Sequence, residues 1–453
     1  MLFLQFIHTY QKTLKKMHRI FFLLLFVFPL GLYAQNGGTI SYKQAVALLL
    51  KNNFDIQIAK NNATIADVQN NYGNAGFLPK VDINAGTSLA SNKTKQEFAS
   101  GLKVNQSGVG SQNLNAGAFL TWTIFDGMKM FATKERLNLL ELQGELSMKI
   151  EMEQQIEQLT LLYYQAVRQE QLIKGIEIAM QVSNERIKLY ERKLEIGAGS
   201  NVELLQAKLD HNAQKSNLLS QKSLLNEFKI NLLNVLKMDA TSSIEVDTIF
   251  EFESSRTIEE IKQKIEQSNQ SVMFANRNIL VQEQALKELQ SLHLPVVGLT
   301  SSYNFARSEN AAGFALLNQN LGYNVGLNFS WNIFNGYTTK NQIKVSNYTL
   351  QNSKLESYKV KLSLNNTAVA TFQRMSNDQE ILTLEEDNIK LAQEALDISL
   401  ERLKLGLGNY LEIKESENTY EASITRLVNA RYNLKQSETS LKKLMGNLVN
   451  SGN

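Results

Sequence analysis

The sequence predicts a mainly α-helical chain of long coiled-coil hairpins that also carries four β-strands of the membrane-spanning type. One observation is a duplicated phrase that holds both tryptophans, Trp122-Thr-Ile-Phe-Asp-Gly127 and Trp331-Asn-Ile-Phe-Asn-Gly336. A second phrase recurs at the same offset of 209 positions, Leu194-Glu-Ile-Gly-Ala-Gly-Ser200 and Leu403-Lys-Leu-Gly-Leu-Gly-Asn409. Long runs almost without Gly or Pro join the two phrases. Such an internal duplication makes each half one structural unit.

We expect a leader, followed by a single unit made of two structural repeats. In this division the leader is 1–34, the unit is 35–453, the repeats are about 41–239 and 257–446, and the linker is 240–256. The leader has a positive start, no acidic residue, and an apolar stretch from Ile20 to Leu32 that ends near the small residue Ala34. A retained N-terminal anchor is the alternative, and translation could start at Met1 or Met17.

Without its leader the chain is nearly neutral. Of the 47 Lys and Arg residues four lie in the leader, which leaves 43 basic against 44 acidic residues and a net charge of −1. We therefore expect no basic surface for nucleic acid. Cysteine is absent, so an exported chain of this size must rely on packing or assembly, and it cannot carry a lipid-modified N-terminal Cys.

Each repeat should begin with a helix that a proline ends. Apolar residues at helical spacing predict a helix from about Ser41 to Asn74 and a counterpart from about Thr257 to Leu292. Pro79 and Pro295 follow, and the residue before a proline is pushed out of the α region. We expect each helix to end there.

After each proline the apolar period changes from 3.6 to 2. The clearest example is the face formed by Tyr323, Val325, Leu327, Phe329, Trp331 and Ile333. The first repeat alternates in the same way, and polar loops are expected at about 91–113 and 306–320. Eleven alternating residues span about 28 Å when tilted, which is typical of a transmembrane β-strand. An ordinary half-buried sheet is the alternative.

The long run after each Trp phrase predicts a helix that approaches about 100 Å. Such a rod needs partners along its length. Two interleaved series spaced by seven predict packing on two sides, as in a cylinder of coiled coils. In the first repeat they are Ile173, Met180, Ile187 and Leu194, then Val182, Leu189 and Ile196; in the second, Leu382, Ile389, Leu396 and Leu403, then Leu391, Ile398 and Leu405. Return helices are expected at about Asn201–Lys237 and Asn409–Met445, and a short extra strand in the linker.

Four strands cannot close a barrel, and lipid does not tolerate an open sheet edge. Bacterial barrels begin at eight strands. The chain should therefore oligomerise, with each copy giving four strands to one shared barrel. The residues alone allow two, three or four copies.

These features together resemble the TolC-like outer membrane efflux protein family. The resemblance rests on the Leu-Pro before a strand, the Trp-x-Ile-Phe-x-Gly entry into a long helix and the Leu-Gly-x-Gly-type turn, each found twice, and it covers nearly the whole unit. It implies a homotrimer with a shared β-barrel in the outer membrane, and an α-helical barrel that crosses the periplasm as a tunnel. The implied partners are outer-membrane lipid, a periplasmic adaptor protein and an inner-membrane pump of the RND or ABC type.

The resemblance also implies candidate working residues. Glu412 and Glu415 match paired acidic positions that ring the tunnel entrance, where like charges attract cations. Two solvated glutamates are the alternative. A Tyr and an Arg that help lock the entrance in the best-known members align with Leu403 and Gly408, so that lock is expected to be missing.

The glycine turns are the second candidate site. Glycine permits the φ > 0 values of a tight helix reversal. By resemblance the turns also accept the tip of the adaptor, and turn chemistry alone is the alternative. The residues are Leu194, Gly197, Ala198, Gly199, Leu405, Gly406, Leu407 and Gly408.

Trp122, Phe125, Trp331 and Phe334 are the third set, at the junction of strand and helix. Indole rings favour the boundary of lipid and water, so we expect these residues at the periplasmic edge of the barrel. Burial between barrel and tunnel is the alternative.

The sequence predicts no enzyme, cofactor or metal site, because it has no Cys/His metal spacing, phosphate loop or nucleophile elbow. The leading hypothesis is a passive export duct of a tripartite efflux or type I secretion system. A non-conducting periplasmic coiled-coil scaffold or adhesin anchored in the outer membrane is the alternative.

Overall fold

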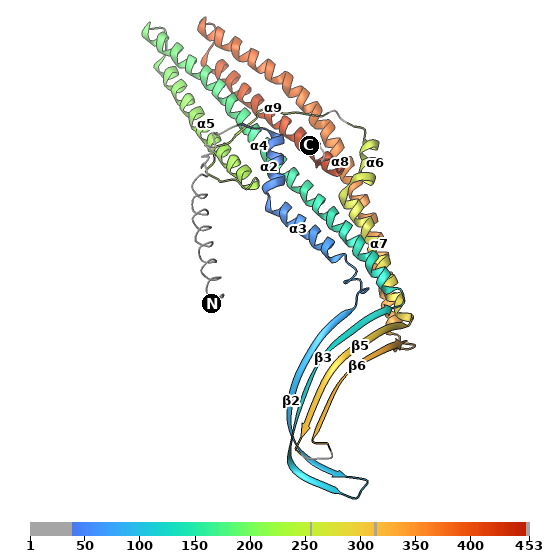
Figure 1. Ribbon diagram of the computed structural model, residues 1–453. Helices are drawn as coiled ribbons and strands as arrows, with labels where there is room; N and C mark the ends of the chain where they lie inside the picture. The colour runs from blue at the N-terminus through green and yellow to red at the C-terminus, as the bar shows by residue number, and fades with distance from the viewer. Residues whose placement is uncertain (1–38, 254–255, 312–314, 450–453) are drawn as a thin grey trace, which may run out of the picture.

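The computed structural model describes residues 39–253, 256–311 and 315–449, and the expected leader lies outside them. The described chain is elongated, with a curved sheet at one end and long helices at the other (Figure 1). Among the described residues no helix is long and apolar enough to cross a membrane.

The two long helices confirm the strongest expectation from the sequence. Helices α4 (Lys129–Glu195) and α8 (Thr338–Lys404) have 67 residues each, and their return helices α5 (Asn201–Val235) and α9 (Tyr410–Leu444) have 35 each. At about 1.5 Å per residue, each long helix extends about 100 Å. Gly144 and Gly175 inside α4 mark close approaches, since a Cβ on Gly175 would lie 2.5 Å from Ile424 of α9.

The first helix of each half differs from the expectation, because it is two helices. In the first half α2 (Tyr42–Asn52) precedes α3 (Phe54–Gln69), and in the second half α6 (Ile258–Ser268) precedes α7 (Gln270–Gln290). Asn53 and Asn269 stand at the breaks in extended conformation, and each side-chain oxygen accepts two N–H groups of the next helix. Each amide group also donates to the end of a return helix, Asn53 to Val235 O at 3.4 Å and Asn269 to Leu444 O at 2.9 Å.

The prediction that proline ends these helices is wrong for the first half. Helix α3 ends at Gln69, ten residues before Pro79, because asparagine side chains take over the backbone groups there. Asn71 donates to Val68 O and Asn74 to Gln69 O. In the second half a short 3-10 helix, η1 (Ser291–His293), carries the chain almost to Pro295.

Four antiparallel strands form the sheet in the order β2-β3-β5-β6. They are β2 (Lys80–Glu97), β3 (Lys103–Phe125), β5 (Val296–Asn310) and β6 (Leu317–Ser330). Pairs such as Val81 with Leu120 and Leu299 with Leu327 place the alternating apolar residues on one face, as the sequence predicts. The strand expected through Ile333 ends earlier, at Ser330.

The predicted loops at 91–113 and 306–320 are wrong, because both regions are mostly strand. Pairing continues to Glu97 with Lys103 in one hairpin and to Glu309 with Leu317 in the other. Strand ladders are made by backbone groups, so polar side chains do not prevent them, and beyond a lipid band they face water.

The linker contains a short strand, as expected, and this strand belongs to a small parallel pair that was not predicted. Strand β4 (Glu245–Val246) pairs with β1 (Thr39–Ile40) beside the middle of α4. Ile244 and Val246 are buried there with the core that joins α2, α4 and α5.

The helices form one layer whose order follows that of the strands. Near the sheet, α3, α4, α7 and α8 contact each other in that order, while toward the tips the order is α5, α4, α9 and α8 (Figure 1). Helix α8 is at one edge of the layer along its whole length, and α3 and then α5 form the other edge.

Candidate functional site

The helix tips far from the sheet hold the predicted turns, and both turns have the same construction. Gly197 and Gly406 adopt left-handed φ values of 73° and 76°. The second glycines lie against the end of the preceding helix, where a Cβ on Gly199 would be 2.9 Å from Leu194 N and one on Gly408 would be 3.1 Å from Leu403 N. Glycine is therefore required twice in each turn, once for φ and once for space.

The two tips are joined to each other. Lys193 Nζ at the end of α4 donates to Leu403 O at the end of α8, at 3.0 Å. Arg402 donates to Leu407 O across the second turn, at 3.2 Å. The cationic side chains thus donate to backbone carbonyl groups at and just beyond the C-terminal end of α8, where positive charge is favourable.

Large apolar side chains are exposed at the tips. Ile196 is 77% exposed, Leu405 72% and Leu407 69%. Leu194 is also exposed, and Ala198 lies between the two glycines of its turn on the surface. Contiguous exposed apolar groups typically mark an interaction surface.

The acid pair behaves differently at its two positions. Glu412 accepts an ion pair from Arg402 Nε at 2.7 Å, and its backbone N–H is capped by Asn409. Glu415 is exposed, and no ion pair joins it to another described residue. The two carboxylates are alike in the sequence, and the role of Arg402 was not predicted, because it lies ten residues before Glu412 on the other side of the turn.

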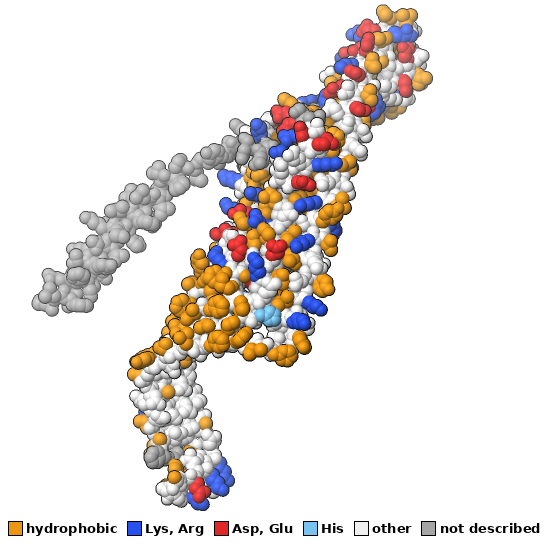
Figure 2. Space-filling model, turned by 90° about the vertical axis from the view of Figure 1, so that its right-hand side faces the viewer, with side chains coloured by type: hydrophobic (Ala, Val, Ile, Leu, Met, Phe, Trp, Pro, Cys, Tyr) orange, Lys and Arg blue, Asp and Glu red, His pale blue; other side chains and the backbone are white. Residues whose placement is uncertain are grey.

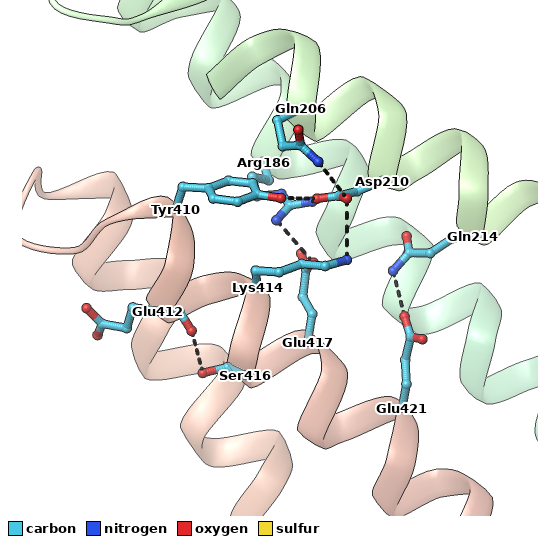
Figure 3. A network of polar contacts seen from close by, with 10 residues as sticks. All are labelled: Arg186, Gln206, Asp210, Gln214, Tyr410, Glu412, Lys414, Ser416, Glu417 and Glu421. Atoms are coloured by element: carbon cyan, nitrogen blue, oxygen red, sulfur yellow. Dashed lines mark hydrogen bonds and ion pairs between the residues drawn. The ribbon is translucent and has the colours of Figure 1, made fainter. Parts of the chain in front are cut away.

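A buried polar network lies just behind the tips and was not predicted (Figure 3). Arg186 of α4 and Glu417 of α9 are both fully buried, and Arg186 Nη1 lies 3.2 Å from Glu417 Oε2. Arg186 Nη2 also contacts Asp210 of α5 at 3.0 Å. Asp210 accepts a hydrogen bond from Tyr410 at 2.7 Å and lies 3.6 Å from Lys414 Nζ. One arginine thus joins the hairpin α4–α5 to the hairpin α8–α9.

The two acids of the network respond oppositely to this environment. Burial raises the pKa of Glu417 to about 7, because the loss of water outweighs the attraction of Arg186 and Lys414. Burial also raises the pKa of Asp210, but the hydrogen bond from Tyr410 and the charges of Lys414 and Arg186 outweigh it and hold that pKa below its usual value. A signal was available in the sequence, because Glu417 stands at helical spacing between the apolar residues Ile413 and Tyr420.

At the junction of sheet and helices, the tryptophan of each half donates a hydrogen bond to the backbone just before the proline of that half. Trp122 Nε1 donates to Phe77 O at 2.8 Å, and Trp331 Nε1 donates to His293 O at 3.0 Å. Both indole rings remain partly exposed, at 39% and 53%. Each tryptophan therefore ties the strand to the Leu-Pro segment of its own half. Phe334 is exposed and Phe125 is half-buried.

The turn after each tryptophan begins the long helix. Gly127 and Met128, like Gly336 and Tyr337, adopt left-handed conformations in succession. Asp126 and Asn335 then accept the N–H groups of Met130 and Thr339 in the first turn of α4 and α8. The shared Asp/Asn-Gly pair of the duplicated phrase is thus a helix start.

This chain matches a known protein family over most of its length. A family model described as outer membrane efflux protein matches residues 45–236 and 261–447. The outer membrane protein TolC of Escherichia coli (strain K12) is 20% identical over 357 residues, which cover 75% of this chain and 71% of TolC. TolC of Salmonella enteritidis is also 20% identical, covering 75% of this chain and 70% of that protein.

Solved structures share the fold. CusC superposes with a TM-score of 0.73 at 14% identity, covering 89% of this chain and 92% of CusC. VceC of Vibrio cholerae gives 0.71 at 16% identity, covering 89% of this chain and 96% of VceC. The matched family is one of channels and not of enzymes. Because the family model spans most of both halves, this chain belongs to the outer membrane efflux protein family and is located in the outer membrane, with its helices toward the periplasm.

Proposed function

We propose that this chain forms the outer-membrane channel of a tripartite efflux or type I secretion system. It serves as a passive duct from periplasm to outside, and works with a periplasmic adaptor and an inner-membrane pump of the RND or ABC type. The observation that carries the proposal is a layer with two open edges, at which neither the sheet nor the helices contact a further strand or helix of the described chain.

The sheet supports assembly because its end strands have free edges. Among the described residues, the order β2-β3-β5-β6 leaves one side of β2 and one side of β6 without a paired strand. Unpaired backbone groups are costly in lipid, so β6 of one copy should pair with β2 of the next. Three copies, as in the family, give a closed barrel of twelve strands.

The helices support the same assembly, since both edges of the layer expose apolar stripes. One of the two heptad series on α8 and its C-cap is exposed in the single chain, namely Leu391, Ile398 and Leu405. Leu396 and Leu403 of the other series are buried. The opposite edge exposes stripes on α3 and α5, formed by Phe54, Ile58, Ile65 and Val68 and by Val202, Leu205, Leu209 and Leu219. A contact between two different edges of identical copies is heterologous, and it forms a ring when the rotation from copy to copy closes. We propose a homotrimer with a shared β-barrel and α-barrel.

Within this channel we propose the division into a leader, two repeats and a linker that the sequence predicts. The leader is 1–34, the unit is 35–453, the repeats are about 41–239 and 257–446, and the linker is 240–256. Equal helix lengths in the two halves and a repeated asparagine break support the division.

The candidate sites take their proposed roles at the two ends of the periplasmic part. The exposed apolar turns accept the adaptor, and Glu412 with Glu415 forms the acidic ring of the entrance. Trp122, Phe125, Trp331 and Phe334 lie at the periplasmic edge of the barrel. The Arg186 network joins the two hairpins of one chain behind their tips. A movement that separates these two tips must therefore break its ion pairs or move both hairpins together.

Planar-bilayer recording of the purified oligomer tests the proposal. A duct conducts ions in some opening condition, and conductance should rise when the network is weakened, as in Arg186→Met. A scaffold or adhesin gives no conductance in either protein. Absence of conductance in both, with the oligomer intact, would overturn the channel.

A further inference from the structure

The charged side chains of the sheet are gathered at its free end, away from the helices. In β2, β3, β5 and β6 the only other charged residues are Lys80 and Asp82, next to the helices. The six at the free end are Lys93, Lys95, Glu97, Lys103, Arg307 and Glu309. Figure 2 shows acidic and basic groups at this tip, and almost none along the rest of the sheet in view.

All six lie on the apolar face of the sheet and not on the opposite, polar face. In β2 the apolar residues Val81, Ile83 and Leu89 are odd-numbered, as are Lys93 and Lys95. Strand β2 keeps this alternation, because the extra residue of the bulge lies in β3, where Val109 and Gln106 face Asn92 and Thr94. The acid of Glu97 pairs across to Lys103, so these residues share the face as well.

The second hairpin follows the same rule. Tyr303 pairs with Tyr323 on the apolar face, and Arg307 and Glu309 continue the odd series beyond them. Arg307 is also opposite Leu114 and Glu309 opposite Gln112, which is the partner of Leu89. In each hairpin the charged residues thus follow the apolar residues along the same face. Because the second hairpin is shorter, Arg307 and Glu309 are level with Thr87 and Leu89, and only Lys93, Lys95, Glu97 and Lys103 lie beyond Leu89 on the first hairpin.

The cluster has an excess of positive charge. Glu97 forms an ion pair with Lys103 at 2.7 Å, and Glu309 forms one with Arg307. Lys93 and Lys95 are exposed, and no ion pair joins either lysine to a described carboxylate. Lys93 lies about 13 Å and Lys95 about 20 Å along the strand from Leu89, the last large apolar residue of that face on β2.

We propose that Lys93 and Lys95, with Lys103 on the neighbouring strand, bind the phosphate groups of the anionic glycolipid in the outer leaflet. In the membrane the apolar face meets hydrocarbon, so the next residues along it lie at the level of the lipid headgroups. Lysine stems can follow the apolar surface while the ammonium group reaches a phosphate. The inference rests on the membrane position of the sheet, which is part of the proposed function, but not on conductance.

Native mass spectrometry of the full-length oligomer in detergent tests this inference. The probe is bisphosphorylated lipid A, compared with the same lipid after removal of both phosphates. Because each lysine near an anionic surface contributes measurably, Lys93→Gln with Lys95→Gln should lower the affinity for the phosphorylated lipid by about tenfold or more at low salt. The affinity for the dephosphorylated lipid should not change.

Two further variants control the experiment. Lys262→Gln with Lys264→Gln removes two exposed lysines at the same spacing from α6, and should bind like the unchanged protein. Lys93→Arg with Lys95→Arg keeps both charges, and should keep the affinity.

Three outcomes would overturn the inference. The first is equal affinity of the double Gln variant and the unchanged protein for the phosphorylated lipid. In that case the lysines would serve only to keep the exposed strand from pairing with other chains. The second is equal binding of the two lipids, and the third is displacement of the lipid by an equal concentration of inorganic phosphate. Conductance, recorded separately, shows whether the channel itself has failed.

Discussion

Single residues at the tips show how position within one turn changes the chemistry of a carboxylate. Glu412 is held by Arg402, so much of its charge is neutralised within the chain. Glu415, three residues later on the same helix, is exposed. The two acids of the proposed ring are therefore unequal.

Replacing these acids should change ion selectivity by different amounts. We expect Glu415→Ala to weaken cation selectivity more than Glu412→Ala, and the double variant to weaken it most, because only Glu415 presents an unpaired charge. Reversal potentials in asymmetric KCl across a planar bilayer measure this. Unchanged selectivity in the double variant would contradict the ring, and Glu401→Ala at an exposed position of α8 is a control.

Glu417 gives stability a pH dependence near neutrality. Its folded pKa of about 7 is above its ordinary value, so the folded state binds this proton more tightly than the unfolded state does. The contribution of Glu417 to stability is therefore most favourable at low pH. It falls as the pH rises from the ordinary pKa of a glutamate to the folded pKa of about 7, and it is constant at higher pH.

Glu417→Gln should remove this dependence. The difference in Tm between the unchanged protein and the variant should grow in favour of the variant as pH rises from 5 to 8, since Gln needs no proton. Thermal unfolding followed by circular dichroism measures it. Glu415→Gln changes an exposed residue and is the control, whose difference in Tm from the unchanged protein should not vary with pH. If the difference in Tm for Glu417→Gln were also independent of pH, the raised pKa of Glu417 would be contradicted.

At the scale of elements, the two hairpins are copies in backbone and differ in their side chains. Both turns use a left-handed glycine and a second glycine packed on the helix end. The second turn presents Leu405 and Leu407, where the first has Ile196 and Ala198. We expect the second turn to provide the larger apolar contact for an adaptor.

Leu407→Glu should impair export while the oligomer remains intact. Its side chain is 69% exposed, so the fold loses little, whereas a charge would have to be desolvated in an apolar interface. Chemical cross-linking to the adaptor, together with substrate export from cells, measures the effect. Leu407→Met keeps an apolar side chain of similar size at the same position and is the matched control. Normal cross-linking and export in the Glu variant would reject the docking role.

On the scale of the whole molecule, the exposed edges are the main feature of the single chain. Strand β6 and helix α8 form one edge, and strand β2 with helices α3 and α5 forms the other. Since apolar stripes follow both edges, sheet and helices predict the same neighbour on each side.

Charges placed in one stripe should therefore prevent assembly. Leu391→Asp with Ile398→Asp would bury two carboxylates between copies without partners, at a cost of several kcal/mol. We expect loss of the oligomer in detergent, measured by light scattering, with helical content kept. Asn388→Asp, which is exposed on the same helix, should assemble normally. An intact oligomer of the double variant would show that this stripe is not an interface.

The sequence determined the parts of this protein that depend on local periodicity and on repeated phrases. Long helices, apolar strand faces, glycine turns and the family were all recognisable, because spacing along the chain dictates which residues share a face. Strand lengths and the asparagine breaks were misjudged, since backbone pairing and capping there depend on partners distant in the sequence.

Only the tertiary structure decided which charged groups meet. Arg186 and Glu417 are 231 positions apart, and nothing in their local sequence pairs them. The packing of α4 against α9 brings them together, and burial there gives the pair its energetic weight. Register likewise decided that the charges at the free end of the sheet share the apolar face, because one bulge could have turned them to the other side.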